Sequence, residues 1–297
     1  LSVAKGNSAG ASNCGGGLVP GESQLPSVTY MPGSGRIISN GGNAPDGGQM
    51  EFITISTLGN GVDFGDSAGG NTRAYCGATA NATRAMFMGG DTPSKTNLVD
   101  AVDFASRGNS FDFGNLTAAR QAIPGGTGSS TRGIIGGGQE FPARVNTVDF
   151  ITFSSTGNAT DLCDLTVGRG QVAATGNETR GIFGGGQSPS TVDTIDFITI
   201  ASTANGVDFG NLTTARRLAD AASSPTRALF VGGLTPSSSN IIDFITIGTT
   251  GNAQDFGDLS LAKYSMGVTS SPTRAVIMGG NTSPTALDDI EYVNIAT

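Results

Sequence analysis

Short apolar runs alternate with polar, glycine-rich segments along the whole chain, and one phrase recurs among them. Each copy reads Thr-Arg (Gly-Arg in the first), then a mostly apolar run, then Gly-Gly, at 35–42, 83–90, 131–138, 179–186, 226–233 and 273–280. The arginines of these copies are spaced 48, 48, 48, 47 and 47 residues apart: Arg36, Arg84, Arg132, Arg180, Arg227 and Arg274. A period in the forties is typical of the blades of a β-propeller.

Each repeat contains four segments that we expect to be strands. The first follows a basic residue, as in 215–223, and the second is the apolar run into Gly-Gly. The third alternates apolar and polar residues, as in 240–247, and the fourth carries Asp-Phe-Gly, as in 255–259. Alternation and β-branched residues favour strands, and clusters of Gly, Pro, Ser and Asn favour turns. With no sustained helical period, the sequence predicts an all-β fold.

Counting repeats predicts a single domain, a six-bladed β-propeller of four-stranded antiparallel blades over 1–297. Five complete Arg-to-Arg intervals and one partial repeat favour six blades over seven, and their bounds are about 1–68, 69–115, 116–165, 166–212, 213–259 and 260–297. An insertion at 14–34 separates the first and second strands of the first blade, and it is too short for four strands.

The blades resemble kelch repeats. A kelch blade opens with a basic residue and a small-residue strand, continues with an apolar strand ending in Gly-Gly, and closes on a strand that carries Trp. Here the position of that Trp holds another apolar side chain: Phe64, Phe113, Leu162, Phe209 and Phe256. The resemblance implies a kelch-like propeller. The phrases DFGNLTxAR and TRGIFGGG also resemble repeats in structural proteins of marine bacteriophages, cyanophages especially.

Composition removes several classes of function. The chain has no His, which excludes Ser-His-Asp catalysis and His-ligated metal sites. Its net charge of −8 argues against nucleic acid as a partner. No apolar run has the length of a membrane span, so we expect no membrane insertion. Three cysteines fit neither a disulfide framework nor a metal spacing, and we expect no cofactor.

Residues that recur at one register are best explained by packing. We expect the paired glycines to let a strand end tightly or to adopt positive φ, and we expect twelve phenylalanines to form the core between blades. These are Phe52, Phe64, Phe87, Phe104, Phe113, Phe150, Phe183, Phe197, Phe209, Phe230, Phe244 and Phe256.

Twelve of the 16 basic residues fall into two sets of six. One set is the Gly-Gly arginines given above. The other, the strand-one basic set, precedes the first strands: Lys5, Arg73, Arg120, Arg169, Arg216 and Lys263. As a ring, this second set would bind an anion such as a carboxylated or sulfated glycan. The alternative is a lattice of internal ion pairs, because acids also recur at Glu51, Asp103, Asp149, Asp196, Asp243 and Glu291 and at Asp63, Asp112, Asp161, Asp208 and Asp255.

Departures from the repeat are the better candidates for a binding site. Tyr30 and Met31 lie in the insertion, and Phe141 and Arg144 lie in an irregular loop after Gly138. Aromatic and arginine side chains dominate binding hot spots. The two loops join different strand pairs and need not share a face.

These observations predict a non-enzymatic phage virion component, a fibre, tail or capsid-surface propeller. Expected partners are other virion subunits or a host-surface glycan, at the virion surface or outside the cell, and a homo-oligomer is left open. The alternatives are a carbohydrate-active enzyme, for which paired carboxylates remain formally available, and a cellular kelch-type adaptor.

The termini predict an incomplete last blade. Residues 1–13 align with 165–177 and 259–271, so they read as the first strand of blade one. The chain stops at the end of a third strand, and a bare sheet edge is usually avoided. We expect three strands in blade six, beside blade one. The fourth strand would come from residues upstream of Leu1 in a longer gene product, which we favour, or from a partner chain by β-augmentation.

Overall fold

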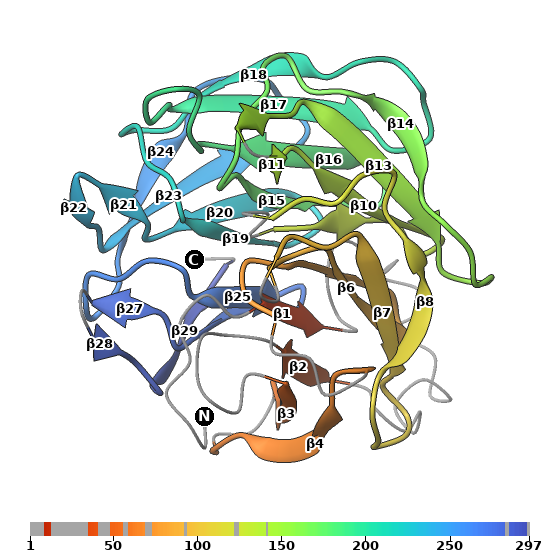
Figure 1. The fold of residues 1–297 in the computed structure, drawn as a ribbon. Coiled ribbons are helices and arrows are strands. Elements are labelled where there is room, and N and C mark those ends of the chain that lie inside the picture. The colour runs from red at the N-terminus through yellow and green to blue at the C-terminus, as the bar shows by residue number, and fades with distance from the viewer. Residues whose placement is uncertain are drawn as a thin grey trace.

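The computed structural model describes residues 9–12, 35–40, 48–55, 59–68, 73–91, 94–121, 125–140, 142–282 and 285–295. These residues contain no helix. They form six antiparallel sheets that follow one another around a central axis, so the fold is a six-bladed β-propeller, as the repeat predicts (Figure 1).

Each blade is an up-and-down sheet whose strands follow the chain outward from the axis. Blade one holds β1 (Ala9–Ser12), β2 (Arg36–Asn40), β3 (Gln49–Thr54) and β4 (Val62–Asp66). Blade two holds β5 (Gly77–Ala80), β6 (Arg84–Met88), β7 (Leu98–Asp103) and β8 (Phe111–Asn115). Blade three holds β9 (Thr127–Gly128), β10 (Arg132–Gly136), β13 (Thr147–Thr152) and β14 (Thr160–Asp164).

The second half of the ring repeats this order. Blade four holds β15 (Ala173–Gly176), β16 (Arg180–Gly184), β17 (Thr194–Thr199) and β18 (Val207–Asn211). Blade five holds β19 (Asp220–Ser223), β20 (Arg227–Val231), β23 (Ile241–Thr246) and β24 (Gln254–Asp258). Blade six holds three strands, β25 (Gly267–Ser270), β26 (Arg274–Met278) and β29 (Ile290–Asn294), as predicted.

Two-stranded ribbons project between the second and third strands of three blades. They are β11 (Gln139–Glu140) with β12 (Ala143–Arg144), β21 (Leu234–Thr235) with β22 (Ser237–Ser238), and β27 (Asn281–Thr282) with β28 (Thr285–Ala286). The sequence does not reveal these ribbons, because a strand of two residues is too short to show alternation.

The Asp-Phe-Gly phrase of the fourth strand encodes a β-bulge. In blade four, Ile195 pairs with Gly210 and Asp196 pairs with Asp208, so Phe209 between them has no partner. Gly210 has a φ of 146°, a value open to glycine, and its neighbour Phe209 is buried. The same shift occurs in blades one, two, three and five, at Phe64, Phe113, Leu162 and Phe256.

The bulged side chains join the core between blades. Phe64 of blade one lies in a cluster with Cys76, Ala78 and Phe104 of blade two, and Phe209 of blade four lies in one with Ala219 and Ile247 of blade five. The sheets therefore bury their faces against each other around the ring, as expected for a propeller.

The paired glycines close the second strands as predicted. Gly185 and Gly186 have φ of 65° and 103°, and the Gly186 N–H donates to the carbonyl of Arg216 in the next blade at 2.9 Å. A side chain at Gly185 would meet that carbonyl oxygen, so this crossing requires glycine.

Blade two departs from the predicted register at two positions. Arg73 pairs with Asp100, not Asp103, and Asp103 instead contacts Arg84 on the second strand. The residue aligned with Phe52 and Phe150 is Ala101, because Met86 pairs with Ala101 as Ile38 pairs with Phe52. Phe104 is aligned three residues further on, with Ile55. Asp103 and Phe104 therefore lie three residues beyond the repeat positions that the sequence assigned to them.

An aromatic ring has changed strands in blade two. Ala101 pairs with Phe111, whereas in blade four Phe197 pairs with Val207. The Arg84 guanidinium accordingly lies 5.5 Å from the ring of Phe111, beside the bulged Phe113 at 5.4 Å, while Arg180 lies 4.7 Å from the ring of Phe197. The cation–π contact is kept although its ring comes from the neighbouring strand.

Moving the ring back should reveal the exchange as an energetic coupling. We expect Ala101→Phe to cost about 1–3 kcal/mol by overpacking, and Phe111→Val to cost about 0.5–1 kcal/mol through the lost cation–π contact. The double variant should recover about 1 kcal/mol relative to the sum, measured by urea unfolding. Additivity within about 0.5 kcal/mol would refute the exchange.

Candidate binding site

The described members of the strand-one basic set lie inside the blades. Each arginine makes an ion pair with the acid of the third strand of its own blade: Arg73–Asp100 at 2.6 Å, Arg120–Asp149 at 2.7 Å, Arg169–Asp196 at 2.8 Å and Arg216–Asp243 at 2.9 Å. Their side chains are at most 4% exposed. Lys5 lies outside the described residues.

Further hydrogen bonds hold each pair in place, as blade four illustrates. Arg169 donates to the carbonyls of Gly185 and Thr194, at 3.1 and 2.6 Å. Thr166 donates through Oγ1 to Asp196 at 2.7 Å. The phrase Leu-Thr-x-x-Arg therefore directs a hydroxyl and a guanidinium to one carboxylate.

This geometry matches the internal ion pairs that the sequence allows. Burial lowers the pKa of the guanidinium groups of Arg120, Arg169 and Arg216, and the paired aspartates offset part of that effect. A carboxylate of the same blade faces each of these arginines. Binding of an external anion at this ring stays a prediction.

The Gly-Gly arginines connect consecutive blades. Each donates through Nη1 to a backbone carbonyl of the next blade, at 2.7 to 2.9 Å: Arg36 to Phe104, Arg84 to Phe153, Arg132 to Ile200, Arg180 to Ile247, Arg227 to Ile295 and Arg274 to Ile55. The last of these bonds joins blade six to blade one. This set therefore closes the ring by contacts within the chain.

The four loop candidates do not come together as one described site. Tyr30, Met31 and Phe141 lie outside the described residues. Arg144 lies half-buried on β12, in the ribbon of blade three. In an up-and-down sheet, the first and second strands end at opposite ends of the blade, so the end of β1 and the ribbon that carries Arg144 lie at opposite ends of their blades.

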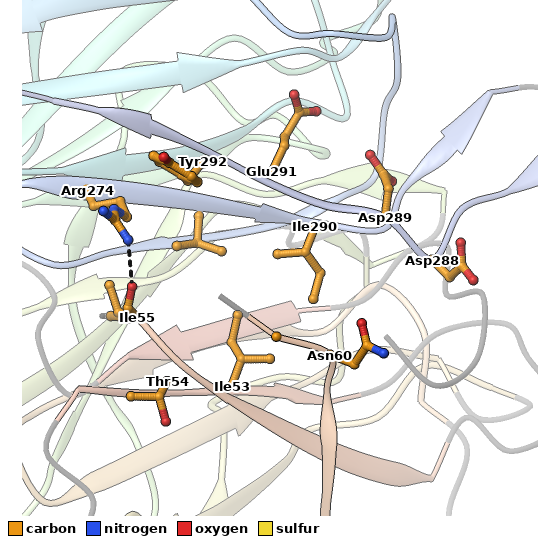
Figure 2. A pocket seen from close by; sticks show the side chains of 12 residues that line it. Ile53, Thr54, Ile55, Asn60, Arg274, Asp288, Asp289, Ile290, Glu291 and Tyr292 are labelled. Carbon is orange, nitrogen blue, oxygen red and sulfur yellow. Dashed lines mark hydrogen bonds between the residues drawn. The ribbon is translucent and has the colours of Figure 1, made fainter. Parts of the chain in front are cut away.

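A groove of about 490 Å³ lies between blade six and blade one. Its apolar lining comes from Ile53 and Ile55 of blade one and from Val276, Ile290 and Tyr292 of blade six. Ile53 and Ile290 point toward one another across it, and Arg274 spans its end to the Ile55 carbonyl (Figure 2). This groove was not predicted from the sequence, although the lack of a fourth-strand phrase in 260–297 is a signal for it.

Two acids in the wall of the groove, Asp289 and Glu291, pair with the buried Lys263 behind them. The Lys263 ammonium lies 2.7 Å from Glu291 and 2.8 Å from Asp289. Burial by itself would raise the pKa of Glu291, but its hydrogen bond and charge pairing with Lys263 and the hydrogen bonds from Ser260 lower that pKa overall. Glu291 is therefore a carboxylate at neutral pH.

Other chemistry is sparse in the part of the chain that the structure covers. Among the described residues, no group of three or more His, Cys, Asp or Glu could hold a metal ion. Cys76 and Cys163 are free and buried, and burial, with Asp164 and Asp161, raises the pKa of Cys163 to about 11. No helix among these residues is long and apolar enough to cross a membrane.

No protein-family model matches the chain, and no curated protein matches it. The six-bladed β-propeller fold therefore follows from the strand geometry alone.

Removing a buried arginine should test the role of the strand-one basic set. We expect Arg169→Ala to destabilise the fold by about 3–5 kcal/mol, because it leaves Asp196 buried without its partner. Arg144→Ala, on the half-buried ribbon, should change stability by less than about 0.5 kcal/mol. Urea unfolding measures both, and equal effects would contradict the assignment.

Acid should remove the contribution of Glu291. Because its folded pKa lies below the ordinary value of 4.5, the stability it contributes is present above that value and is lost as pH falls through the folded pKa. The stability difference between the wild type and Glu291→Gln should therefore shrink below about pH 4.5. A difference that grows on acidification in urea unfolding would show the opposite sign.

Proposed function

We propose that the chain is a non-catalytic, kelch-like propeller of a phage virion, in a fibre, a tail or the capsid surface, and that its irregular loops bind a host glycan or a neighbouring subunit. The proposal rests on the positions and partners of the repeated charged side chains. The described strand-one basic residues are paired inside blades, and the Gly-Gly arginines join blades. The repeated residues thus hold a rigid ring together, and recognition falls to what is irregular.

The kelch-like blade type rests on shared features of sequence. A basic residue precedes each first strand, Gly-Gly ends each second strand, and a large apolar side chain lies on the fourth strand where kelch repeats carry Trp. The virion assignment rests on the resemblance of phrases such as TRGIFGGG to repeats of phage structural proteins. A ring whose consecutive blades bury faces against each other and are joined by hydrogen bonds suits a durable particle component.

Virion location gives the direct test. We expect antibodies raised against the recombinant chain to label purified particles of the phage that encodes it, and mass spectrometry to recover the chain from them. Its absence from particles would overturn the virion assignment. Turnover of a glycoside that is abolished by changing one acid would instead favour the enzyme.

Loop variants test the binding residues. We expect alanine at Tyr30, Met31, Phe141 and Arg144 together to weaken glycan or subunit binding at least tenfold, because aromatic and arginine anchors dominate hot spots. Lys95→Ala is the matched control, since Lys95 is a basic residue in the same connection of blade two. Binding unchanged in the fourfold variant would exclude these loops and direct attention to the strand-one basic set.

A further inference from the structure

The groove beside β29 corresponds to a filled space at other blade interfaces. By strand register, Ile290 and Tyr292 of blade six correspond to Met50 and Phe52 of blade one. Ile53 and Ile55, on the opposite wall, correspond to Val102 and Phe104 of blade two. In the complete interface between blades one and two, these four counterparts (Met50, Phe52, Val102 and Phe104) enclose Phe64, the bulged side chain of the fourth strand. The groove is that cluster without its phenylalanine.

Exposure on β29 agrees with a missing strand. Tyr292 is 47% exposed, while the equivalent Phe52 is 9% exposed and makes an edge contact with Phe64 at 6.1 Å. The Glu291 side chain is 20% exposed, against 0% for Asp149, Asp196 and Asp243. In the described chain, no strand pairs with the outer edge of β29.

The far wall of the groove carries an acceptor positioned for a strand. In four blades, an Asn before the fourth strand accepts a backbone N–H from the fourth strand of the previous blade, at 3.0 to 3.1 Å: Asn109 from Asp66, Asn158 from Asn115, Asn205 from Asp164, and Asn252 from Asn211. Asn60 is the equivalent in blade one and lines the groove. No described strand reaches it.

The neighbouring blade is uncovered in the same region. In blade four, a side chain at Gly210 would collide with the carbonyl of Gly251, which belongs to the Gly-Asn turn of blade five. At Gly257 of blade five, no described atom lies within 4 Å of such a side chain. Phe256 beside it is half-buried, while Phe209 is buried.

We propose that this groove is an acceptor for an extended segment of another polypeptide, the second of the two sources expected from the termini, which adds the fourth strand to blade six. The segment carries the fourth-strand phrase, a Gly-Asn turn followed by x-Asp-Phe-Gly-Asp-Leu. Its backbone pairs with β29, its Phe enters between Ile290 and Ile53, and a backbone N–H after its Gly donates to Asn60. Its Gly-Asn turn covers Gly257. Recognition is therefore β-augmentation with one side-chain pocket.

The five fourth strands within the chain argue for this occupant over a flat edge-to-edge dimer. Each places a bulge opposite the third strand, and the bulge turns a large side chain of the fourth strand into the neighbouring blade. A second copy pairing through β29 would offer a strand without Phe-Gly and would leave the groove unfilled. The inference is independent of the virion assignment, because the partner is defined by its strand chemistry alone.

A peptide with the chain's own phrase tests the inference. The probe is acetyl-GNAQDFGDL-amide, which reproduces residues 251–259, added to the full 297-residue chain. We expect saturable binding by calorimetry, with slowed hydrogen exchange of the β29 amides. Replacing the peptide's Phe by Ala should weaken binding at least tenfold, since the Phe supplies most of the buried apolar area.

Two asparagine variants separate groove binding from exchange with an existing strand. Asn60→Ala should raise the Kd of the peptide about fivefold, as for one lost hydrogen bond, without lowering the stability of the free chain. Asn252→Ala, at the same turn of a filled interface, should lower stability and leave the Kd unchanged. Tyr292→Ala, at a side chain already half in solvent, should also weaken binding.

Three results would overturn the proposal. The first is no binding of the peptide to a folded chain, and the second is equal binding of the Phe and Ala peptides. The third is a dimer of the chain that Tyr292→Lys dissociates and the peptide does not, which would assign β29 to a second copy. Each result leaves the virion proposal standing, because that is tested on particles.

Discussion

In blades one to five, a bulge in the fourth strand turns one large side chain into the next sheet, and the packing of the ring depends on that contact. Fully burying a phenylalanine contributes about 1.5–3 kcal/mol, and no blade can gain this alone because the burying surface belongs to its neighbour. Gly210, with φ of 146° and a neighbouring carbonyl where a side chain would be, shows the backbone condition for the turn. The Phe-Gly dipeptide thus couples local conformation to blade packing.

The two sets of basic residues act at different levels of this architecture. Arg169 joins the second and third strands of its blade, because it donates to the Phe183 carbonyl and to the buried Asp196 carboxylate. Arg180 and its relatives stack on an aromatic ring of their own blade and donate to a carbonyl of the next. A buried pair gains little over apolar packing, but an acid left without its arginine is costly. The pairs therefore favour the native register of each sheet over shifted alternatives.

The periodicity predicted the fold well because each repeat encodes the same strands, turns and bulges. The spacing of the arginines, the Gly-Gly ends and the Phe-Gly bulges all recur, and six blades followed from them, with three strands in the last. The alignment of blade two was wrong for two reasons. Its third strand has two aspartates, and the aromatic ring expected on that strand comes instead from Phe111 on the fourth strand. Alignment by residue type assigned the repeat positions to Asp103 and Phe104, whereas the pairing with β6 assigns them to Asp100 and Ala101. The ribbons were not predicted because their two-residue strands are too short to show alternation. The groove was not predicted because its two walls lie far apart in the sequence.

The interface between blades six and one shows how much of closure the fourth strand contributes. Its cluster of buried described residues consists of Ile37, Ile55, Val276 and Met278, with no bulged phenylalanine. Arg274 still lies 4.3 Å from the ring of Tyr292 and donates to Ile55, so the polar connection is complete while the apolar one is not. Because a hydrogen bond contributes less than a buried aromatic side chain, the described part of this interface lacks the larger of these two contributions. A strand placed in the groove would supply the one component that five interfaces have and the sixth lacks.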